Sequence, residues 1–149
     1  MAPRLLLFVV IMFAAHAALA DALRVGMSVD YPPLTYKQEG RVVGIEADNA
    51  LAVAKLLGRE LRIVELPFTG LIPALQAGEI DVIMSGMSVT EERAKAVVFA
   101  EPYMDIGQMA ITLTRNAGRF AQSWAIYQGD VRVGVEPETT GAAFAAAEL

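Results

Sequence analysis

The chain has 149 residues, 55% of them hydrophobic, and a formal net charge of −5 at pH 7. This length suits one modest domain, and the negative charge argues against nucleic acid or an acidic membrane surface as the partner. There is no cysteine, so disulfides and thiol chemistry are excluded, whereas a small anionic ligand remains possible because a local cation decides whether it binds.

The first 20 residues have the composition of a cleavable export signal. Arg4 precedes an apolar run at residues 5–15, which is too short to span a bilayer. A small-x-small motif at residues 18–20 predicts cleavage before Asp21. The alternative, an uncleaved anchor, is disfavoured by the polar, turn-rich sequence that follows. Export without disulfides is ordinary for a bacterial periplasmic protein, so we expect a periplasmic location.

Periodicity and breaker residues divide the rest of the chain into alternating strands and helices. In chain order we expect a strand at 23–27, an extended turn at Pro32-Pro33, a hairpin turning near Gly40, a helix at 46–57, a strand at 61–66, a helix at 71–77, a strand at 80–84, a short helix at 90–96, a strand-like segment at 106–115, a helix or loop at 120–127, a strand at 131–135 and a final alanine-rich helix. This alternation predicts an α/β fold with a largely parallel sheet.

Two of these elements carry more specific expectations. The helix at 46–57 is placed by the helical spacing of its apolar residues, with Gly58 as its stop. Glu46 and Asp48 fall in its first turn, where the helix dipole favours acids. The strand at 80–84 is apolar enough for the middle of a sheet.

The strongest chemical signal is Arg93, which the pattern places in the first turn of a helix just beyond a strand. Open α/β sheets bind anions where a strand ends and a helix begins. Gly86 would let a ligand approach the backbone, while Ser88 has capping-box spacing to Glu91 and Thr90 is a second candidate cap. The planar fork of Arg93 suits a carboxylate. The alternative is a surface arginine that pairs with a protein acid.

Two aromatic residues and a threonine pair extend this candidate site. Tyr31 follows the first strand and Phe68 the second, so parallel strands would place both on the same edge. There they would wall an apolar slot; the alternative for each is a core position. Thr139-Thr140-Gly141 offers hydroxyls and N–H groups ahead of a helix, a second anion-binding lip, with a plain N-cap as the alternative.

Signals for catalysis, metals and phosphate are poor. The only histidine, His16, lies in the predicted export signal, so the mature chain has neither His nor Cys. This excludes ordinary Ser–His–Asp or Cys–His catalysis and nitrogen or sulfur metal sites, although carboxylate chemistry remains possible. We expect no catalytic residue, no metal and no cofactor.

These residues resemble a known family. Residues 71–103 closely resemble the core of family 3 solute-binding proteins, the periplasmic polar amino-acid receptors of ABC importers: LIPALQAGEIDVIMSGMSVTEERAKAVVFAEPY. Residues 44–57 (GIEADNALAVAKLL) resemble the family's helix-one signature, and the opening RVGMSVDYPPL and the later VRVGV and TTG also fit. The likeness runs through nearly all of the mature chain, and the 71–103 block is its specific part.

The resemblance implies an α/β clamshell like that of periplasmic binding proteins of type II, in which ligand binds between two lobes. It implies lobe one at residues 21–110, and a hinge crossing with the start of an incomplete lobe two at residues 111–149. It also implies a monomer that captures an amino acid or similar small zwitterion by hinge closure and delivers it to the membrane permease of an ABC importer.

The family's ligand-binding positions can be carried over residue by residue. Arg93 resembles the arginine that grips the ligand α-carboxylate, and Ser88 resembles the hydroxyl residue beside it. Gly86 resembles the position whose backbone contacts the ligand ammonium. Tyr31 and Phe68 resemble the aromatic walls of the site.

Departures from the family pattern fall mainly in the predicted second lobe. Thr140 resembles the residue that closes on the carboxylate, but Glu138 stands where a glycine usually precedes the threonine pair and brings a negative charge to this lip. Ser28 stands where many members carry an acid. The second-lobe acid that binds the amino group has no counterpart, so we expect a truncated or partial chain.

Functions other than transport stay open on the same fold. A periplasmic enzyme related to cyclohexadienyl or arogenate dehydratase needs an acid poised beside the arginine, and the front domain of a lytic transglycosylase needs a further C-terminal domain. The sensor domain of a membrane receptor needs a transmembrane run downstream.

Overall fold

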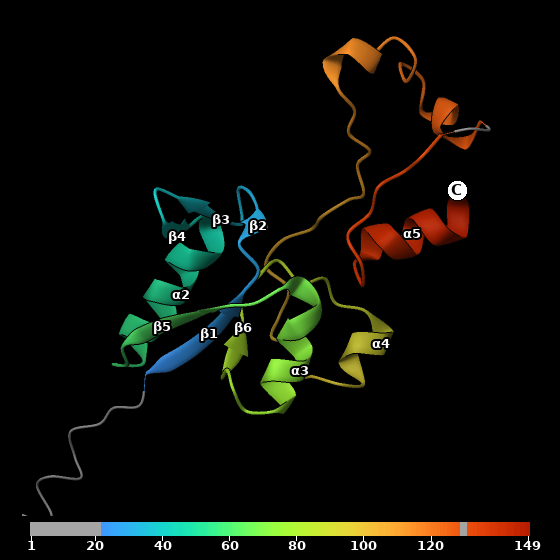
Figure 1. Ribbon diagram of the computed structural model, residues 1–149. Helices are drawn as coiled ribbons and strands as arrows, with labels where there is room; N and C mark the ends of the chain where they lie inside the picture. Colours follow the sequence, from blue (N-terminus) through green and yellow to red (C-terminus); the bar gives the residue numbers. More distant parts are fainter. Residues whose placement is uncertain (1–21, 129–130) are drawn as a thin grey trace, which may run out of the picture. The chain divides into compact units, whose positions relative to one another are not determined.

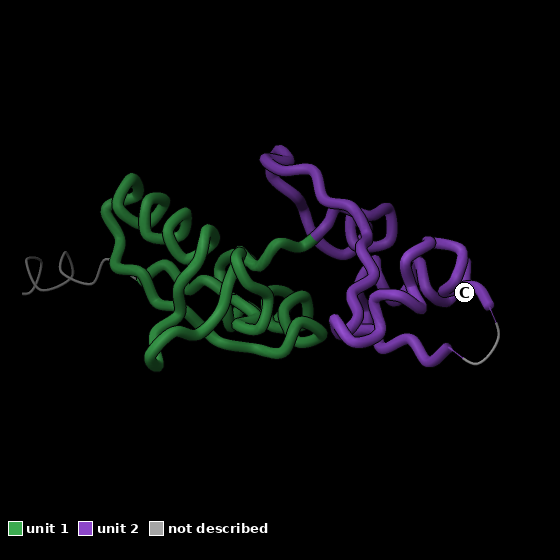
Figure 2. Tube along the Cα trace, turned by 90° about the horizontal axis from the view of Figure 1, so that it is seen from above, with its two compact units in different colours: residues 1–87 green, residues 88–149 purple. Residues whose placement is uncertain are grey.

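The chain divides into two compact units, Met1–Met87 and Ser88–Leu149, which Figure 2 shows in green and purple and which we call the first and second unit. The computed structural model describes residues 22–128 and 131–149. The predicted export signal at residues 1–20 lies outside the described residues. In the part of the chain that the structure describes, no helix is long and apolar enough to cross a membrane.

A parallel three-stranded sheet forms the centre of the first unit (Figure 1). In spatial order its strands are β5 (Leu61–Glu65), β1 (Leu23–Met27) and β6 (Val82–Ile83). β1 pairs with β5 along its whole length, from Leu23 opposite Leu61 to Met27 opposite Glu65. The predicted parallel α/β sheet is confirmed, but the strand expected at 80–84 is shorter and lies at an edge.

Opposite faces of β1 are covered by two different helices, α2 (Ile45–Leu56) and α3 (Leu71–Gln76). The buried cluster on the α2 side consists of Leu23, Val25, Met27, Ala50 and Ala54. Gly26 faces the other way, because a Cβ added there would lie 2.4 Å from Ile80 and 3.2 Å from Leu71 of α3. Residues alternate between the faces of a strand, so β1 is buried on both sides and takes the middle of the sheet.

An antiparallel sheet of short strands follows β1 along the chain. Its strands are β2 (Asp30–Tyr31), β3 (Thr35–Gln38) and β4 (Arg41–Val43). β3 and β4 form the predicted hairpin, and Gly40 turns it with φ +77°. The peptide bond between Pro32 and Pro33 is cis, and these two residues separate β2 from β3.

The helices of the first unit begin and end close to their predicted positions. α2 lies within one residue of the helix predicted at 46–57, and Gly58 ends it with φ +65°. A 3₁₀ segment, η1 (Phe68–Gly70), leads directly into α3. Glycine supplies the left-handed conformation that stops α2 without a steric cost, which is why its end could be placed from the sequence.

Charged side chains join the amino ends of β1 and β6. Arg24 donates from Nη2 to Asp81 Oδ1 at 2.6 Å and from Nη1 to the carbonyl oxygen of Gly78 at 2.6 Å. Arg59 Nη2 lies 3.4 Å from Asp81 Oδ2. The hydrogen bonds from Arg24 are the main cause that lowers the pKa of Asp81 from 3.8 to about 2. This network fixes the turn after α3 at the end of the sheet opposite to the predicted site.

The second unit is built from short helical segments joined by loops. They are α4 (Glu91–Ala94), η2 (Thr114–Asn116), η3 (Ser123–Tyr127) and α5 (Thr140–Glu148), where η marks a 3₁₀ helix. α4 and α5 confirm the short helix and the alanine-rich helix predicted there. η3 occupies most of the stretch at 120–127, for which a helix or loop is expected.

The strands predicted at 106–115 and 131–135 are wrong, because no described residue of the second unit forms a strand. A strand is stable only when its N–H and C=O groups pair with a neighbour. Neither stretch pairs with another segment of the described chain. Their apolar side chains are accordingly left outside a core, and Met109 is 86% exposed.

Candidate ligand-binding site

Gly86 forms a sharp bend just beyond β6, with φ +63°. A Cβ added to Gly86 would lie 2.6 Å from Cδ1 of Leu34 and 3.3 Å from Cε1 of Tyr31. The backbone of Gly86 is therefore packed against these two side chains, and its positive φ favours glycine. The structure thus brings together two of the predicted site residues, Tyr31 and Gly86.

The carboxyl ends of β1 and β6 are joined by hydroxyl side chains that the sequence analysis did not single out. The main-chain N–H of Ser28 donates to Ser85 Oγ at 2.9 Å, and Ser85 is buried. The buried hydroxyl of Thr35 donates to the carbonyl oxygen of Ser28. Polar residues directly after apolar strands were the available signal, because buried polar groups need partners.

Ser28 also contacts an acid, although it replaces the acid that many family members carry. Its Oγ donates to Asp30 Oδ1 at 2.6 Å, and Asp30 is exposed. Residues two apart in an extended chain point to the same side. A carboxylate is therefore present on this rim, two residues later than the family pattern places it.

Neither predicted aromatic wall residue belongs to the buried core of the first unit. Tyr31 is 44% exposed, and Phe68 is half-buried in η1. Phe68 follows β5 just as Gly86 follows β6, so both lie beyond carboxyl ends of strands in one parallel sheet. Tyr31 is therefore not a core residue, Phe68 is partly buried, and the contact of both with a ligand stays a prediction.

In the second unit, Arg93 is oriented by main-chain carbonyl groups. Its Nη1 donates to the carbonyl oxygen of Ser88 at 2.8 Å, and its Nη2 donates to that of Glu138 at 2.6 Å. Burial lowers the pKa of Arg93, while the negative charges of Glu92 and Glu138 act in the opposite direction. An arginine remains protonated under such conditions, so α4 carries a partly buried cation whose orientation is fixed.

The cap of α4 is Thr90 and not Ser88. Thr90 Oγ1 accepts a hydrogen bond from the main-chain N–H of Arg93 at 3.2 Å. The capping box predicted between Ser88 and Glu91 is therefore wrong, because Thr90 lies three residues before the N–H that it caps. Ser88 instead contributes its carbonyl oxygen to the Arg93 side chain.

Thr139 is the cap of α5, as the simpler alternative for this threonine pair predicts. Its Oγ1 accepts from the main-chain N–H of Ala142 at 3.0 Å. The hydroxyl of Thr140 is engaged differently, since its Oγ1 accepts from Gln108 Nε2 at 2.9 Å. Glu138 has φ +60°, a conformation that favours glycine. The glycine that family members usually carry at this position would therefore be less strained.

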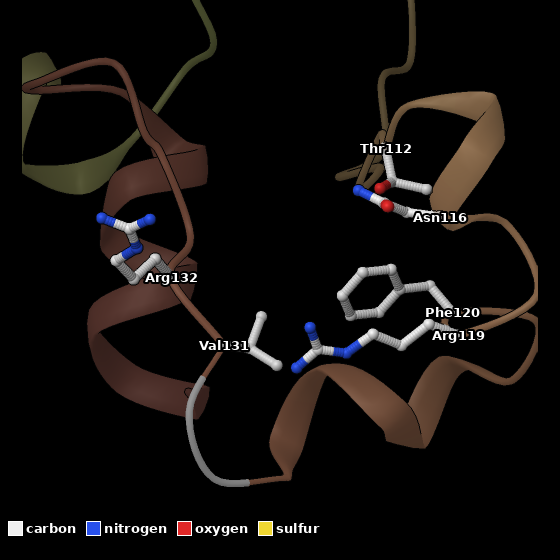
Figure 3. Close-up of a pocket in the computed structure, with 6 residues that line it drawn as sticks. All are labelled: Thr112, Asn116, Arg119, Phe120, Val131 and Arg132. Atoms are coloured by element: carbon white, nitrogen blue, oxygen red, sulfur yellow. The ribbon is translucent and has the colours of Figure 1, made fainter.

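A separate hollow of about 310 Å³ lies in the second unit (Figure 3). It is lined by Thr112, Asn116, Arg119, Phe120, Val131 and Arg132. The guanidinium of Arg119 lies 5.2 Å from the centre of the Phe120 ring, and Figure 3 shows both side chains extending toward Val131. None of the six predicted ligand-binding residues lines it. Across residues 22–128 and 131–149, no group of three or more His, Cys, Asp or Glu residues could hold a metal ion.

Curated relatives of this chain include binding proteins and an enzyme. A probable histidine-binding protein of Campylobacter jejuni is 40% identical over 94 residues, which are 63% of this chain and 37% of that protein. A cyclohexadienyl dehydratase of Pseudomonas aeruginosa is 34% identical over 131 residues, 87% of this chain and 49% of that protein. The chain thus spans about a third to a half of the length of the curated relatives it matches.

A solved structure matches just over half of the chain. The arginine-bound form of domain 1 of the T. maritima arginine-binding protein is 50% identical, with a TM-score of 0.56, and the match covers 56% of this chain and 68% of that one. The family model for bacterial extracellular solute-binding proteins, family 3, matches residues 23–139. This match covers most of the chain, so the chain belongs to the family 3 bacterial extracellular solute-binding proteins.

Proposed function

We propose that this protein is a periplasmic receptor that captures an amino acid or a similar small zwitterion and presents it to the membrane permease of an ABC importer. The observation that carries the proposal is a partly buried guanidinium, that of Arg93, oriented by the carbonyl groups of Ser88 and Glu138. A fixed cation of this kind suits a carboxylate. Relatives described as binding histidine and arginine support an amino acid as the ligand.

In this proposal different site residues contact the carboxylate, the ammonium group and the side chain of the ligand. Arg93 binds the α-carboxylate, with hydroxyl groups from Ser88 and Thr140. The main chain at Gly86 contacts the ammonium group. The rings of Tyr31 and Phe68, which are outside the core, contact the ligand side chain. Aromatic faces accept both apolar and cationic side chains, so these two residues fit more than one amino acid.

Capture works by hinge closure, because a ligand that contacts two lobes stabilises the closed state by its higher affinity for that state. In the proposed arrangement residues 21–110 belong to lobe one, and residues 111–149 contain a hinge crossing and the start of lobe two. The receptor acts as a monomer. Residues 1–20 direct its export to the periplasm and are removed.

Isothermal titration with a panel of amino acids that includes histidine and arginine tests the proposal. Arg93→Ala should weaken binding by about 100-fold or more, because the ligand carboxylate is desolvated and loses its charged partner. Lys95→Ala is the matched control, since it removes an exposed cation two residues away in the chain. Equal affinities of Arg93→Ala and the unaltered protein would rule out the proposed role of Arg93.

A second candidate function is favoured by the match to a cyclohexadienyl dehydratase, which extends over 131 residues. An enzyme of that kind needs an acid near the bound substrate to protonate the leaving group. Incubation of the protein with prephenate or arogenate, followed by analysis for the dehydrated and decarboxylated product, separates the two functions. Turnover at a rate that depends on enzyme concentration would replace the receptor proposal.

A further inference from the structure

We propose that Glu46 is a positioning residue for the ligand-binding loop, and that its carboxylate holds Gly86 in the conformation that meets the ligand. This inference rests on the proposed function, because it assigns Glu46 a part in amino-acid binding. The sequence alone explains Glu46 by the helix dipole, which an exposed acid in the first turn would satisfy equally. The structure instead places its side chain in the interior of the first unit.

The contact between Glu46 and Gly86 is short and partly buried. Glu46 is 2% exposed, and its Oε1 accepts a hydrogen bond from the main-chain N–H of Gly86 at 2.6 Å. The two residues are 40 positions apart in the sequence. An N–H···O distance of 2.6 Å is at the short end for hydrogen bonds in proteins. This bond therefore fixes the loop after β6 to the first turn of α2.

The bond begins where the backbone pairing of the sheet ends. The main-chain N–H of Met84 donates to the carbonyl oxygen of Gly26 at 3.1 Å, which extends the β6 pairing by one residue. Two residues later, the N–H of Gly86 donates to Glu46. A partly buried N–H group is usually paired, and here the acceptor is a side chain. A side chain of α2 thus contributes directly to the conformation of this loop.

Fixing the N–H of Gly86 also fixes a carbonyl group. The peptide bond between Ser85 and Gly86 is trans, so its N–H and C=O groups point in opposite directions. The Ser85 carbonyl group therefore points away from the Glu46 carboxylate. The hydrogen bond to Glu46 fixes the plane of the Ser85–Gly86 peptide, and φ of Gly86 is +63°. Glu46 therefore pre-organises the main chain that would face a ligand ammonium.

Glu46 connects a second loop to the same point. Its main-chain N–H donates to the carbonyl oxygen of Leu34 at 3.0 Å, and the N–H of Ile45 donates to that of Pro33 at 3.2 Å. The first turn of α2 thus holds the loop that begins at Tyr31, while the Glu46 side chain holds the Gly86 loop. Both loops carry predicted ligand-binding residues, so a change at Glu46 should alter their relative placement.

Variants of Glu46 distinguish positioning from simple stability. Glu46→Ala removes the acceptor, and Glu46→Asp keeps the charge but is one methylene too short to reach Gly86. Glu46→Gln keeps an acceptor oxygen at the same reach and should rescue binding. Asp48→Ala is the matched control, because Asp48 is an exposed acid in the same turn of α2. Each variant is studied as the full chain at a temperature well below its midpoint of unfolding.

Two readouts are measured on each variant. The amide resonance of Gly86 in ¹H–¹⁵N spectra of ligand-free protein should move upfield in Glu46→Ala and Glu46→Asp, and little in Glu46→Gln and Asp48→Ala. Amino-acid affinity by titration should fall about ten-fold or more in the first pair and stay within about three-fold in the second pair. Loss of thermal stability with unchanged affinity, or an unmoved Gly86 resonance, would overturn the inference.

Failure of the inference and failure of the proposed function can be told apart. If the unaltered protein binds no amino acid, the receptor function fails and the ligand-positioning role of Glu46 fails with it, while the Gly86 resonance still shows whether Glu46 holds the loop. If the protein binds an amino acid and Glu46→Ala binds it equally well, only the inference on Glu46 fails.

Discussion

The two units of this chain differ in how their apolar residues are satisfied. Among the described residues, every member of the buried hydrophobic core lies between Leu23 and Ile80, in the first unit. The second unit has the same kinds of residue, but Ile111 and Met109 are exposed and none of its described residues forms a strand. Within the described part of the chain, the parallel α/β sheet is therefore confined to the first unit. An apolar strand pattern forms a strand only where a neighbouring segment can pair with it.

The same contrast applies to the predicted ligand-binding residues. In the first unit, Gly86 is held by side chains from three other segments: Tyr31, Leu34 and Glu46. In the second unit, the Arg93 side chain donates to carbonyl groups of the main chain, those of Ser88 and Glu138. Core substitutions should therefore disturb the geometry of a site that packed elements hold. The geometry of a site that loop carbonyl groups hold should instead respond to changes in the local backbone. Four pairs of variants test this difference.

The largest expected difference comes from the same substitution made in each unit. Met27 is fully buried against α2, and Met27→Ala should cost about 2–5 kcal/mol of unfolding free energy, through lost burial and a cavity. Met109→Ala should cost less than about 0.5 kcal/mol, because the side chain is already in solvent. Urea unfolding followed by circular dichroism measures both. Similar losses for the two variants would mean that the second unit has a core of its own.

Gly44→Ala should be the next most disruptive change. Gly44 has φ +122°, and a Cβ added there would lie 2.3 Å from the carbonyl oxygen of Leu34. A main-chain atom cannot give way as a side chain can, so we expect a loss of about 2–4 kcal/mol. Gly58→Ala is the control, because Gly58 also has positive φ but nothing within 4 Å of the added Cβ. It should cost only about 1 kcal/mol, and equal costs would contradict the steric explanation.

Sequence reasoning succeeded where the structure is set by local pattern. Gly58 marks the end of α2 and Gly40 the hairpin turn, because both supply backbone conformations that few other residues adopt. Periodicity likewise placed β1, β5 and α3. The resemblance, together with the position of Tyr31 beyond a strand end, identified a residue that the structure sets against Gly86.

What sequence reasoning missed depends on contacts between distant segments. The strands expected at 106–115 and 131–135 have a suitable pattern, but strand formation also requires a partner, which a single stretch cannot reveal. Glu46 fits the helix dipole as an exposed acid would, so its burial against Gly86, 40 residues away, has no local signature. Thr90 and Ser88 are both plausible caps, and only the observed geometry distinguishes them.

Acid should selectively weaken the first unit through Asp81. Arg24 lowers its pKa to about 2 in the folded protein, below the ordinary value of 3.8. A depressed pKa contributes stability above the unfolded value, and that stability is lost as the pH falls from about 4 to about 2. The Asp81→Asn variant should therefore show a shallower fall in unfolding free energy over this range. The effect is modest because the pair is partly exposed and is screened by salt. If the unfolding free energy of Asp81→Asn falls with pH as steeply as that of the unaltered protein, Asp81 is not the cause of the acid sensitivity. Asp48→Asn, which changes an exposed acid, is the control.

The smallest expected effect is a gain, and it belongs to the second unit. Glu138 adopts φ +60°, and its negative charge acts on Arg93. Glu138→Gly should relieve the backbone strain and stabilise the unit by about 0.5–1 kcal/mol. The gain is small because glycine also has more conformational freedom in the unfolded chain, which opposes folding. It should also tighten amino-acid binding a few-fold, because one negative charge near the proposed carboxylate site is removed. Glu138→Gln separates the two effects, since it removes the charge and keeps the strain. Suppose that Glu138→Gln binds as weakly as the unaltered protein while Glu138→Gly binds more tightly. The backbone conformation at residue 138, whose carbonyl group orients Arg93, would then matter more for binding than the charge of Glu138.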